Sequence, residues 1–163
     1  MDRITVRVGV TGTGSGSRTA LVTHALDYYL NKRSRVRVFR RESDRYMVTE
    51  EPEDREDQDV MVAVIDPLPS SLEKGADRIL ELRSCRTPVI WLLDRGNPAV
   101  NMAALRRYLG FHPDHVQEDV PYETICRAEY SMYEICDLAD LGGIRETAEQ
   151  IEKEYGSQDF RRK

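Results

Sequence analysis

The sequence predicts an α/β fold in which helices cover both faces of a mostly parallel sheet, a three-layer sandwich. Two continuous apolar runs, Val60–Ile65 and Val89–Leu93, carry this prediction, because strands covered on both faces lack polar positions. Amphipathic segments with helical spacing lie between and around these runs. Strands that alternate with helices along a chain favour a parallel sheet between helical layers.

The first 30 residues contain the most specific pattern. Alternating apolar residues from Ile4 to Val10 predict a strand, and helical spacing from Ala20 to about Asn31 predicts a helix. A glycine-rich turn between strand and helix directs backbone N–H groups and a helix N-terminus at an anion. The sequence therefore predicts a phosphate-binding loop, and a glycine-rich turn without a ligand is the alternative. The expected loop residues are Gly12, Thr13, Gly14, Ser15, Gly16, Ser17, Arg18 and Thr19.

This loop departs from the common phosphate-loop pattern G-x-x-x-x-G-K-[ST]. Counted from Gly12, Thr19 keeps the hydroxyl that would face a magnesium ion, but Ser17 replaces the second glycine and Arg18 replaces the lysine. An arginine keeps the charge, but its planar fork is larger than an ammonium group. The loop is therefore suited to binding an anion and poorly suited to hydrolysing a triphosphate.

The segment after the first helix changes in composition. Val36–Phe39 is expected to form a second strand. From Arg40 to Asp59 charged residues dominate, and Pro52 interrupts the middle. Such a segment buries too little apolar surface to offset the entropy of ordering it. We expect residues 40–59 to form an exposed loop.

The later elements follow from apolar spacing and from caps. Ser70 or Ser71 can cap a helix that extends to about Leu82, and Pro88 precedes the next strand. The remaining expected elements are a helix at 103–109 closed by Gly110, a weak strand at 115–120, and helices at 122–133 and 142–155.

Polar residues directly follow three of the predicted strands. The glycine loop follows the first strand, Asp66 follows Val60–Ile65, and Asp94 and Arg95 follow Val89–Leu93. Ligands of parallel sheets bind beyond the carboxyl ends of the strands. We therefore expect these residues to meet at one site.

Length and composition limit which classes of protein are possible. The 163 residues suit one domain at 1–156, with the charged loop 40–59 inside it and a frayed tail at 157–163. A net charge of −5 argues against a nucleic-acid-binding surface. Three cysteines without a CxxC motif fit a reducing compartment. No signal peptide and no transmembrane run is visible, so we expect a soluble, cytoplasmic protein.

These motifs resemble the ParA/MinD-like (SIMIBI-class) P-loop ATPases, of which this chain looks like a shortened and degenerate member. The segments that carry the resemblance are Gly12–Thr19, Val60–Leu82, Val89–Asn97 and Gly110–Ala128. The resemblance implies a P-loop NTPase-like fold that binds ATP or ADP with magnesium. It also implies that Thr19 lies at the metal and that Asp94 and Arg95 lie near the base.

The chain departs from this family at two places. Members usually carry a second lysine near the start of the loop, which reaches across a dimer, whereas Thr13 and Ser15 stand in that region here. Asp66 has two readings. In the first, it is the Walker B aspartate, a magnesium ligand, because aliphatic residues precede it. Alternatively, it belongs to a later strand, which the Pro-Leu-Pro-Ser-Ser sequence after it favours, and Walker B is then missing.

The predicted function is nucleotide or phosphate binding with weak or no ATP hydrolysis, in a regulatory or positioning role. The alternative is a pseudo-ATPase that acts without nucleotide as a protein–protein interaction or assembly module. A homodimer or another protein is the expected partner. The direction of Arg18, into the loop or folded away from it, separates the two functions.

Overall fold

A five-stranded parallel sheet forms the centre of the described structure, with the strand order β2-β1-β3-β4-β5. The computed structural model describes residues 5–14, 17–33, 44–95, 101–120, 134–136 and 139–156. The strands are β1 (Val6–Gly12), β2 (Tyr46–Glu50), β3 (Val60–Ile65), β4 (Val89–Arg95) and β5 (His115–Glu118).

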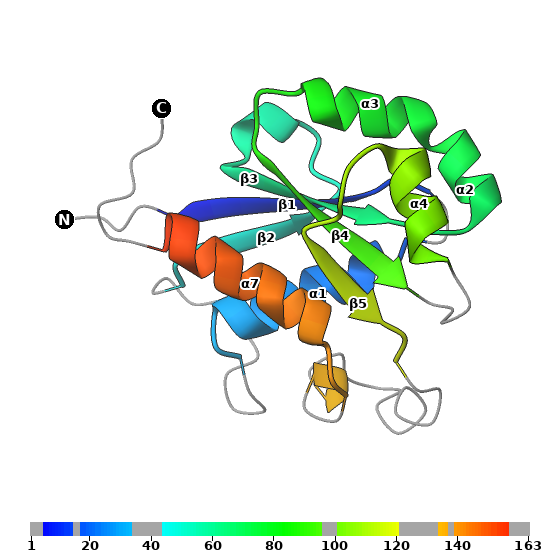
Figure 1. Cartoon of the computed structure of the whole chain (residues 1–163). Helices are drawn as coiled ribbons and strands as arrows, with labels where there is room; N and C mark the ends of the chain where they lie inside the picture. Colours follow the sequence, from blue (N-terminus) through cyan, green and yellow to red (C-terminus); the bar gives the residue numbers. More distant parts are fainter. Residues whose placement is uncertain are drawn as a thin grey trace.

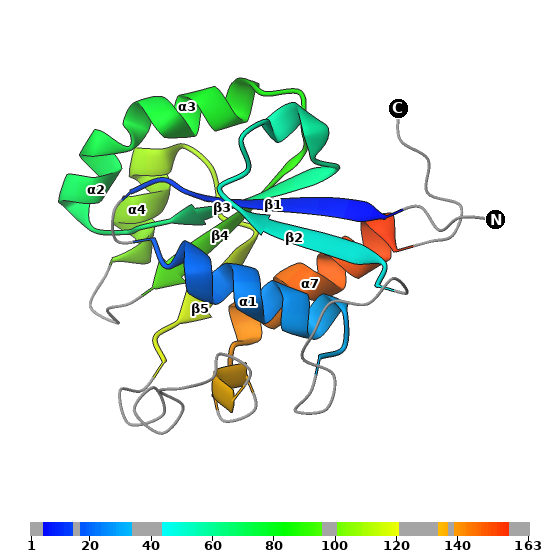
Figure 2. The same cartoon turned by 180° about the vertical axis from the view of Figure 1, so that it is seen from behind.

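Helices cover both faces of this sheet. Helices α1 and α7 lie on one face, and α2, α3 and α4 lie on the other (Figures 1 and 2). This three-layer arrangement confirms the predicted fold class. The helices are α1 (Thr19–Leu30), α2 (Pro69–Lys74), α3 (Ala76–Ser84), α4 (Met102–Leu109) and α7 (Gly142–Tyr155), and a short 3₁₀ helix, η1, spans Arg55–Asp57.

The central strands divide their side chains between two hydrophobic cores. Val62 and Leu92 belong to the core under α1 and α7, whereas Leu93 belongs to the core under α2, α3 and α4. Every residue of β3 is fully buried, as its continuous apolar run predicts. Because β1 pairs with β2 on one side and with β3 on the other, the glycine loop that follows β1 opens at the middle of the sheet.

The prediction of an exposed loop at 40–59 is wrong for Tyr46–Glu50, which form strand β2, whereas η1 has no buried residue. Strand β2 pairs in parallel with β1 from Tyr46 to Glu50. Tyr46 is buried in the core, and its backbone is held by Asn31, whose side chain accepts from the Tyr46 N–H at 3.2 Å and donates to its carbonyl at 3.0 Å. Tyr46 and Val48 both pack in the core under α1 and α7, so β2 has one apolar face despite its charged flanks.

Three predicted segments lie outside the described residues. They are the strand at Val36–Phe39, the helix at 122–133 and the tail at 157–163. Within the described residues, no helix has both the length and the apolar character that crossing a membrane requires.

Candidate phosphate-binding site

The glycine loop curls onto the carboxyl end of β3. The Thr13 N–H donates to the Val64 carbonyl at 3.0 Å, and the Ser17 N–H donates to the Gly14 carbonyl at 3.1 Å. The Ser17 hydroxyl also donates to the Val64 carbonyl at 2.8 Å. Ser17 therefore fits where the common pattern has glycine, because its side chain ties the loop to β3. Ser15 and Gly16 lie outside the described residues.

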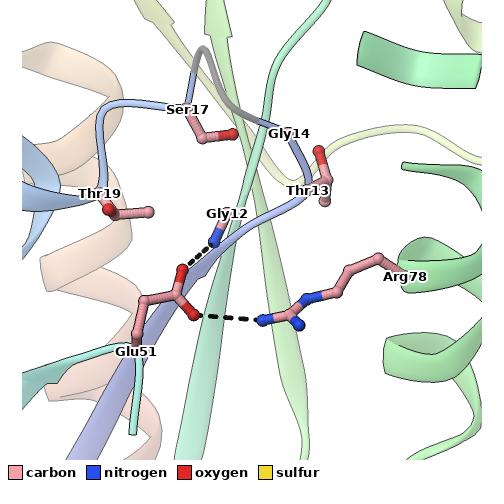
Figure 3. Close-up of a pocket in the computed structure, with 7 residues that line it drawn as sticks. All are labelled: Gly12, Thr13, Gly14, Ser17, Thr19, Glu51 and Arg78. Atoms are coloured by element: carbon pink, nitrogen blue, oxygen red, sulfur yellow. Dashed lines mark hydrogen bonds and ion pairs between the residues drawn. The ribbon is translucent and has the colours of Figure 1, made fainter. Parts of the chain in front are cut away.

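A cavity of about 440 Å³ opens between this loop and the start of α1 (Figure 3). The structure thus brings together at one cavity those predicted loop residues that it describes, apart from Arg18. The residues that line it are Gly12, Thr13, Gly14, Ser17, Thr19, Glu51 and Arg78.

The N-terminus of α1 faces this region without a side-chain cap. Its N-cap residue is Arg18, which makes no capping hydrogen bond, and no acidic residue lies in the first turn. The first N–H groups of a helix have no acceptor within the helix, and the helix dipole makes this end favourable for an anion. A bound anion could serve as the cap that the sequence does not supply.

Arg18 points to β4 rather than into the cavity. Its Nε donates to Asp94 Oδ2 at 2.7 Å and its Nη2 donates to Asp94 Oδ1 at 2.6 Å, while Nη1 lies 3.6 Å from Asp119. The hydrogen bonds to Asp94 raise the pKa of Arg18, so the guanidinium stays charged. Asp94 is nearly buried, and the adjacent Arg95 donates to Glu118 at 3.4 Å. Arg18 therefore bridges the loop to β4.

Asp66 lies behind the loop and does not line the cavity. Its N–H donates to the Thr13 hydroxyl at 3.4 Å, and its Oδ1 accepts from the Leu68 N–H at 3.1 Å. The other oxygen, Oδ2, is buried and has no hydrogen-bond partner in the described part of the chain. Asp66 is thus placed next to Gly14 and Thr13, on the β3 side of the loop.

The acidic groups near the cavity come instead from the end of β2: Glu51 lines the cavity, and Glu50 contacts Thr19, which lines it too. The Thr19 hydroxyl donates to Glu50 Oε2 at 2.6 Å. The carboxylate of Glu51 accepts from the Gly12 N–H at 3.0 Å and from the Thr11 hydroxyl at 2.8 Å. Sequence reasoning missed both glutamates because they stand inside a charged run. The available signal was the short alternation at Tyr46 and Val48 just before them.

A magnesium ion would be chemically compatible with the Thr19–Glu50 pair. Magnesium prefers oxygen ligands, and it commonly takes one or two carboxylates and completes its shell with water and phosphate oxygens. Among the described residues, no group of three or more His, Cys, Asp or Glu side chains forms a metal site. Any magnesium ion here would therefore depend on phosphate oxygens and water for most of its ligands.

A parallel sheet with a glycine loop between β1 and α1, and a threonine at the first helical position, defines a P-loop NTPase-like α/β fold. Two solved structures show which proteins of this fold class the chain resembles. The chain superimposes on a ParA family ATPase from Chlorobium tepidum TLS with a TM-score of 0.61 and 9% identity, covering 91% of this chain and 97% of that one. It superimposes on the MinD cell division protein of Aquifex aeolicus with a TM-score of 0.66 and 9% identity, covering 91% and 98%. The chain therefore has a ParA/MinD-like fold, as its motifs predict.

Neither a scan against protein-family models nor a search of curated proteins matched this sequence. With 9% identity to both structures, the likeness concerns the fold alone.

Proposed function

We propose that the cavity binds a nucleotide or phosphate anion and that the protein has a regulatory or positioning role of the ParA/MinD kind. The observation that carries this proposal is the contact of 2.6 Å between the hydroxyl of Thr19 and the carboxylate of Glu50 at the uncapped start of α1. A hydroxyl beside a carboxylate, next to a glycine loop, suits a magnesium–phosphate pair. The similarity in fold to a ParA family ATPase supports the same class of ligand.

In this proposal Thr19 and Glu50 hold a magnesium ion, which supplies positive charge to the phosphates when it is bound. Asp66 is the second candidate ligand: it lies on the β3 side of the loop and does not line the cavity, but its Oδ2 is buried and lacks a hydrogen bond in the described part of the chain. In the same proposal, the loop residues that line the cavity surround the phosphates, and Asp94 and Arg95 lie towards the base.

We expect weak or no ATP hydrolysis. Phosphoryl transfer depends on a positioned cation at the phosphates, a role that a loop lysine commonly fills. Here the corresponding residue is Arg18, and Asp94 holds its guanidinium through two hydrogen bonds. A cation engaged in this way does not neutralise charge on a transferring phosphoryl group.

A second function, a pseudo-ATPase that works without nucleotide as an interaction or assembly module, is favoured by two observations. Arg18 is folded away from the cavity, and the Glu51 carboxylate already occupies the Gly12 N–H. The partner would be a second copy or another protein in the cytoplasm. A nucleic acid is not expected, given the net charge of −5.

Calorimetric titration with ATP and ADP, with and without magnesium, tests the first function. We expect saturable binding that magnesium strengthens, and a turnover number below about 0.01 s⁻¹. Thr19→Ala should weaken binding about tenfold in magnesium and much less in EDTA, because the hydroxyl acts through the metal. Thr23→Ala is the matched control, since its hydroxyl donates to the Thr19 carbonyl within α1 at 2.7 Å.

Absence of any nucleotide binding would favour the interaction module. Size-exclusion chromatography with light scattering, run with and without nucleotide, would then report whether the chain assembles with itself. Steady ATP hydrolysis that Thr19→Ala abolishes would instead show an active ATPase and contradict the weak-hydrolysis part of the proposal.

A further inference from the structure

A phosphate bound in this cavity would need a cation beside it to neutralise its charge. In the part of the chain that the structure describes, Arg78 is the one cation that lines the cavity, and Glu51 faces it there. Glu50 adds a second negative charge beside Thr19. Because Arg18 is bound to Asp94, a phosphate in this cavity depends on Arg78 for its counter-charge.

Arg78 is held at the cavity by the way α2 and α3 approach the loop. Gly75, at the junction of these helices, packs so closely that an added Cβ would lie 2.1 Å from the Thr13 carbonyl oxygen. Arg78 follows within the first turn of α3 and reaches over the carboxyl end of β1 towards Gly12 (Figure 3). The cation thus comes from the helical layer opposite α1.

The guanidinium of Arg78 does not use all of its N–H donors within the described residues. Its Nη2 donates to the Thr11 hydroxyl and, at 3.2 Å, to Glu51 Oε2. Its Nε is buried and makes no hydrogen bond within the described residues. A guanidinium presents five N–H donors in a planar fork that matches carboxylate and phosphate oxygens. An oxyanion with more oxygens than a carboxylate would use more of this fork.

The carboxylate of Glu51 already sits where such an oxyanion would bind. It accepts from the Gly12 N–H, from the Thr11 hydroxyl and from Arg78. Glu51 also has a φ of 46°, in the left-handed region that non-glycine residues adopt at a cost. Its backbone therefore holds a less favourable conformation while its side chain satisfies three donors around the cavity.

We propose that Arg78 is the phosphate-binding cation of this loop, and that Glu51 is an internal anion which a bound phosphate displaces from Gly12, Thr11 and Arg78. This inference rests on the proposed function, since it names the residues that receive the phosphate. The ligand class is inorganic phosphate or the terminal phosphate of a nucleotide. Glu51 sets the affinity by competing for the same donors, and Arg78 supplies the charge that the loop lacks.

The test is titration of the full chain with sodium phosphate and with ATP, in EDTA and at constant ionic strength. Arg78→Gln should raise the dissociation constant at least about tenfold, because a charge-assisted fork is lost, and Arg78→Lys should give an intermediate value. Glu51→Gln should lower the dissociation constant about tenfold, since the competing charge is removed while the side chain keeps its size. Arg86→Gln, an exposed arginine just before β4 at the opposite end of the sheet, removes the same charge and should change affinity less than twofold.

The outcomes separate this inference from the proposed function. If the wild type binds phosphate or ATP and Arg78→Gln binds equally well, Arg78 is not the phosphate-binding cation, while the proposed function stands. If Arg78→Gln and Arg86→Gln weaken binding equally, only net charge matters and the assignment is overturned. If neither the wild type nor Glu51→Gln binds either ligand, in EDTA or in the same titration repeated with magnesium, the proposed function itself fails. Thermal unfolding by circular dichroism verifies that each variant is folded.

Discussion

Replacing Arg33 with methionine is expected to lower the free energy of unfolding by about 3–5 kcal/mol. The guanidinium lies 2.8 Å from a carboxylate oxygen of Asp44 and 3.1 Å from one of Asp27. The side chains of Arg33 and Asp44 are 3% and 1% exposed. Methionine would fill similar space but would remove the charge that neutralises a buried carboxylate, and such a loss is costly. Urea denaturation monitored by circular dichroism measures it.

The neighbouring Lys32 provides the control. Its ammonium group lies 2.8 Å from Glu152, but the two side chains are 69% and 36% exposed, so Lys32→Met should cost about 1 kcal/mol or less. Equal losses in the two variants would mean that burial does not make the Arg33–Asp44 pair more important for stability.

The Arg33–Asp44 ion pair also matters for the site. It joins the end of α1 to the start of β2, the strand that ends at Glu50 and leads into Glu51.

Strands β1, β3, β4 and β5 and most helices could be predicted because their signals are local. Val60–Ile65 is apolar at each position, and every one of its residues is buried. The helix expected from Ala20 spans Thr19–Leu30, and the last helix spans Gly142–Tyr155 as predicted. Gly110, expected to close the helix at 103–109, is the C-cap of α4 and has a φ of 75°.

Strand β2 could not be recognised because its order comes from contacts with distant residues. It pairs with β1 about 40 positions away, and its backbone is clamped by Asn31. A charged composition indicates how little a segment can bury, but it does not reveal a short strand with one apolar face. The charged composition therefore predicts a solvated loop at Glu50 and Glu51, although the register with β1 sets Glu50 at the end of β2 and Glu51 bonds to Gly12 at the cavity.

At the site, too, contacts between residues far apart in the sequence could not be predicted. The loop residues were found from their spacing, because the phosphate-loop pattern is contiguous in sequence. Arg18 and Asp94 were both predicted as site residues, yet their contact joins positions 76 residues apart and nothing in either motif indicates it. Arg78 gave no sequence signal, since its place at the cavity depends on how α3 packs against the loop.

Gly75→Ala is expected to destabilise the fold by about 1–3 kcal/mol and to weaken phosphate binding at the same time. An added Cβ would lie 2.1 Å from the Thr13 carbonyl oxygen and 2.9 Å from that of Ser71, and both are backbone atoms. Either the loop or the start of α3 must move. Gly75 has φ −90° and ψ 1°, which alanine can adopt, so the loss would come from the steric contact and not from backbone strain. Urea denaturation and the phosphate titration measure the two effects.

Gly110→Ala separates this steric effect from a purely conformational one. Gly110 has a φ of 75° and nothing within 4 Å of an added Cβ, so alanine there should cost about 1 kcal/mol through backbone strain alone. Because Gly110 lies at the end of α4 and does not line the cavity, its substitution should leave the phosphate affinity unchanged. Gly75→Ala should change both stability and affinity. If Gly75→Ala lowers stability but leaves the affinity at the wild-type value, the contact between Gly75 and Thr13 does not position Arg78 for the phosphate.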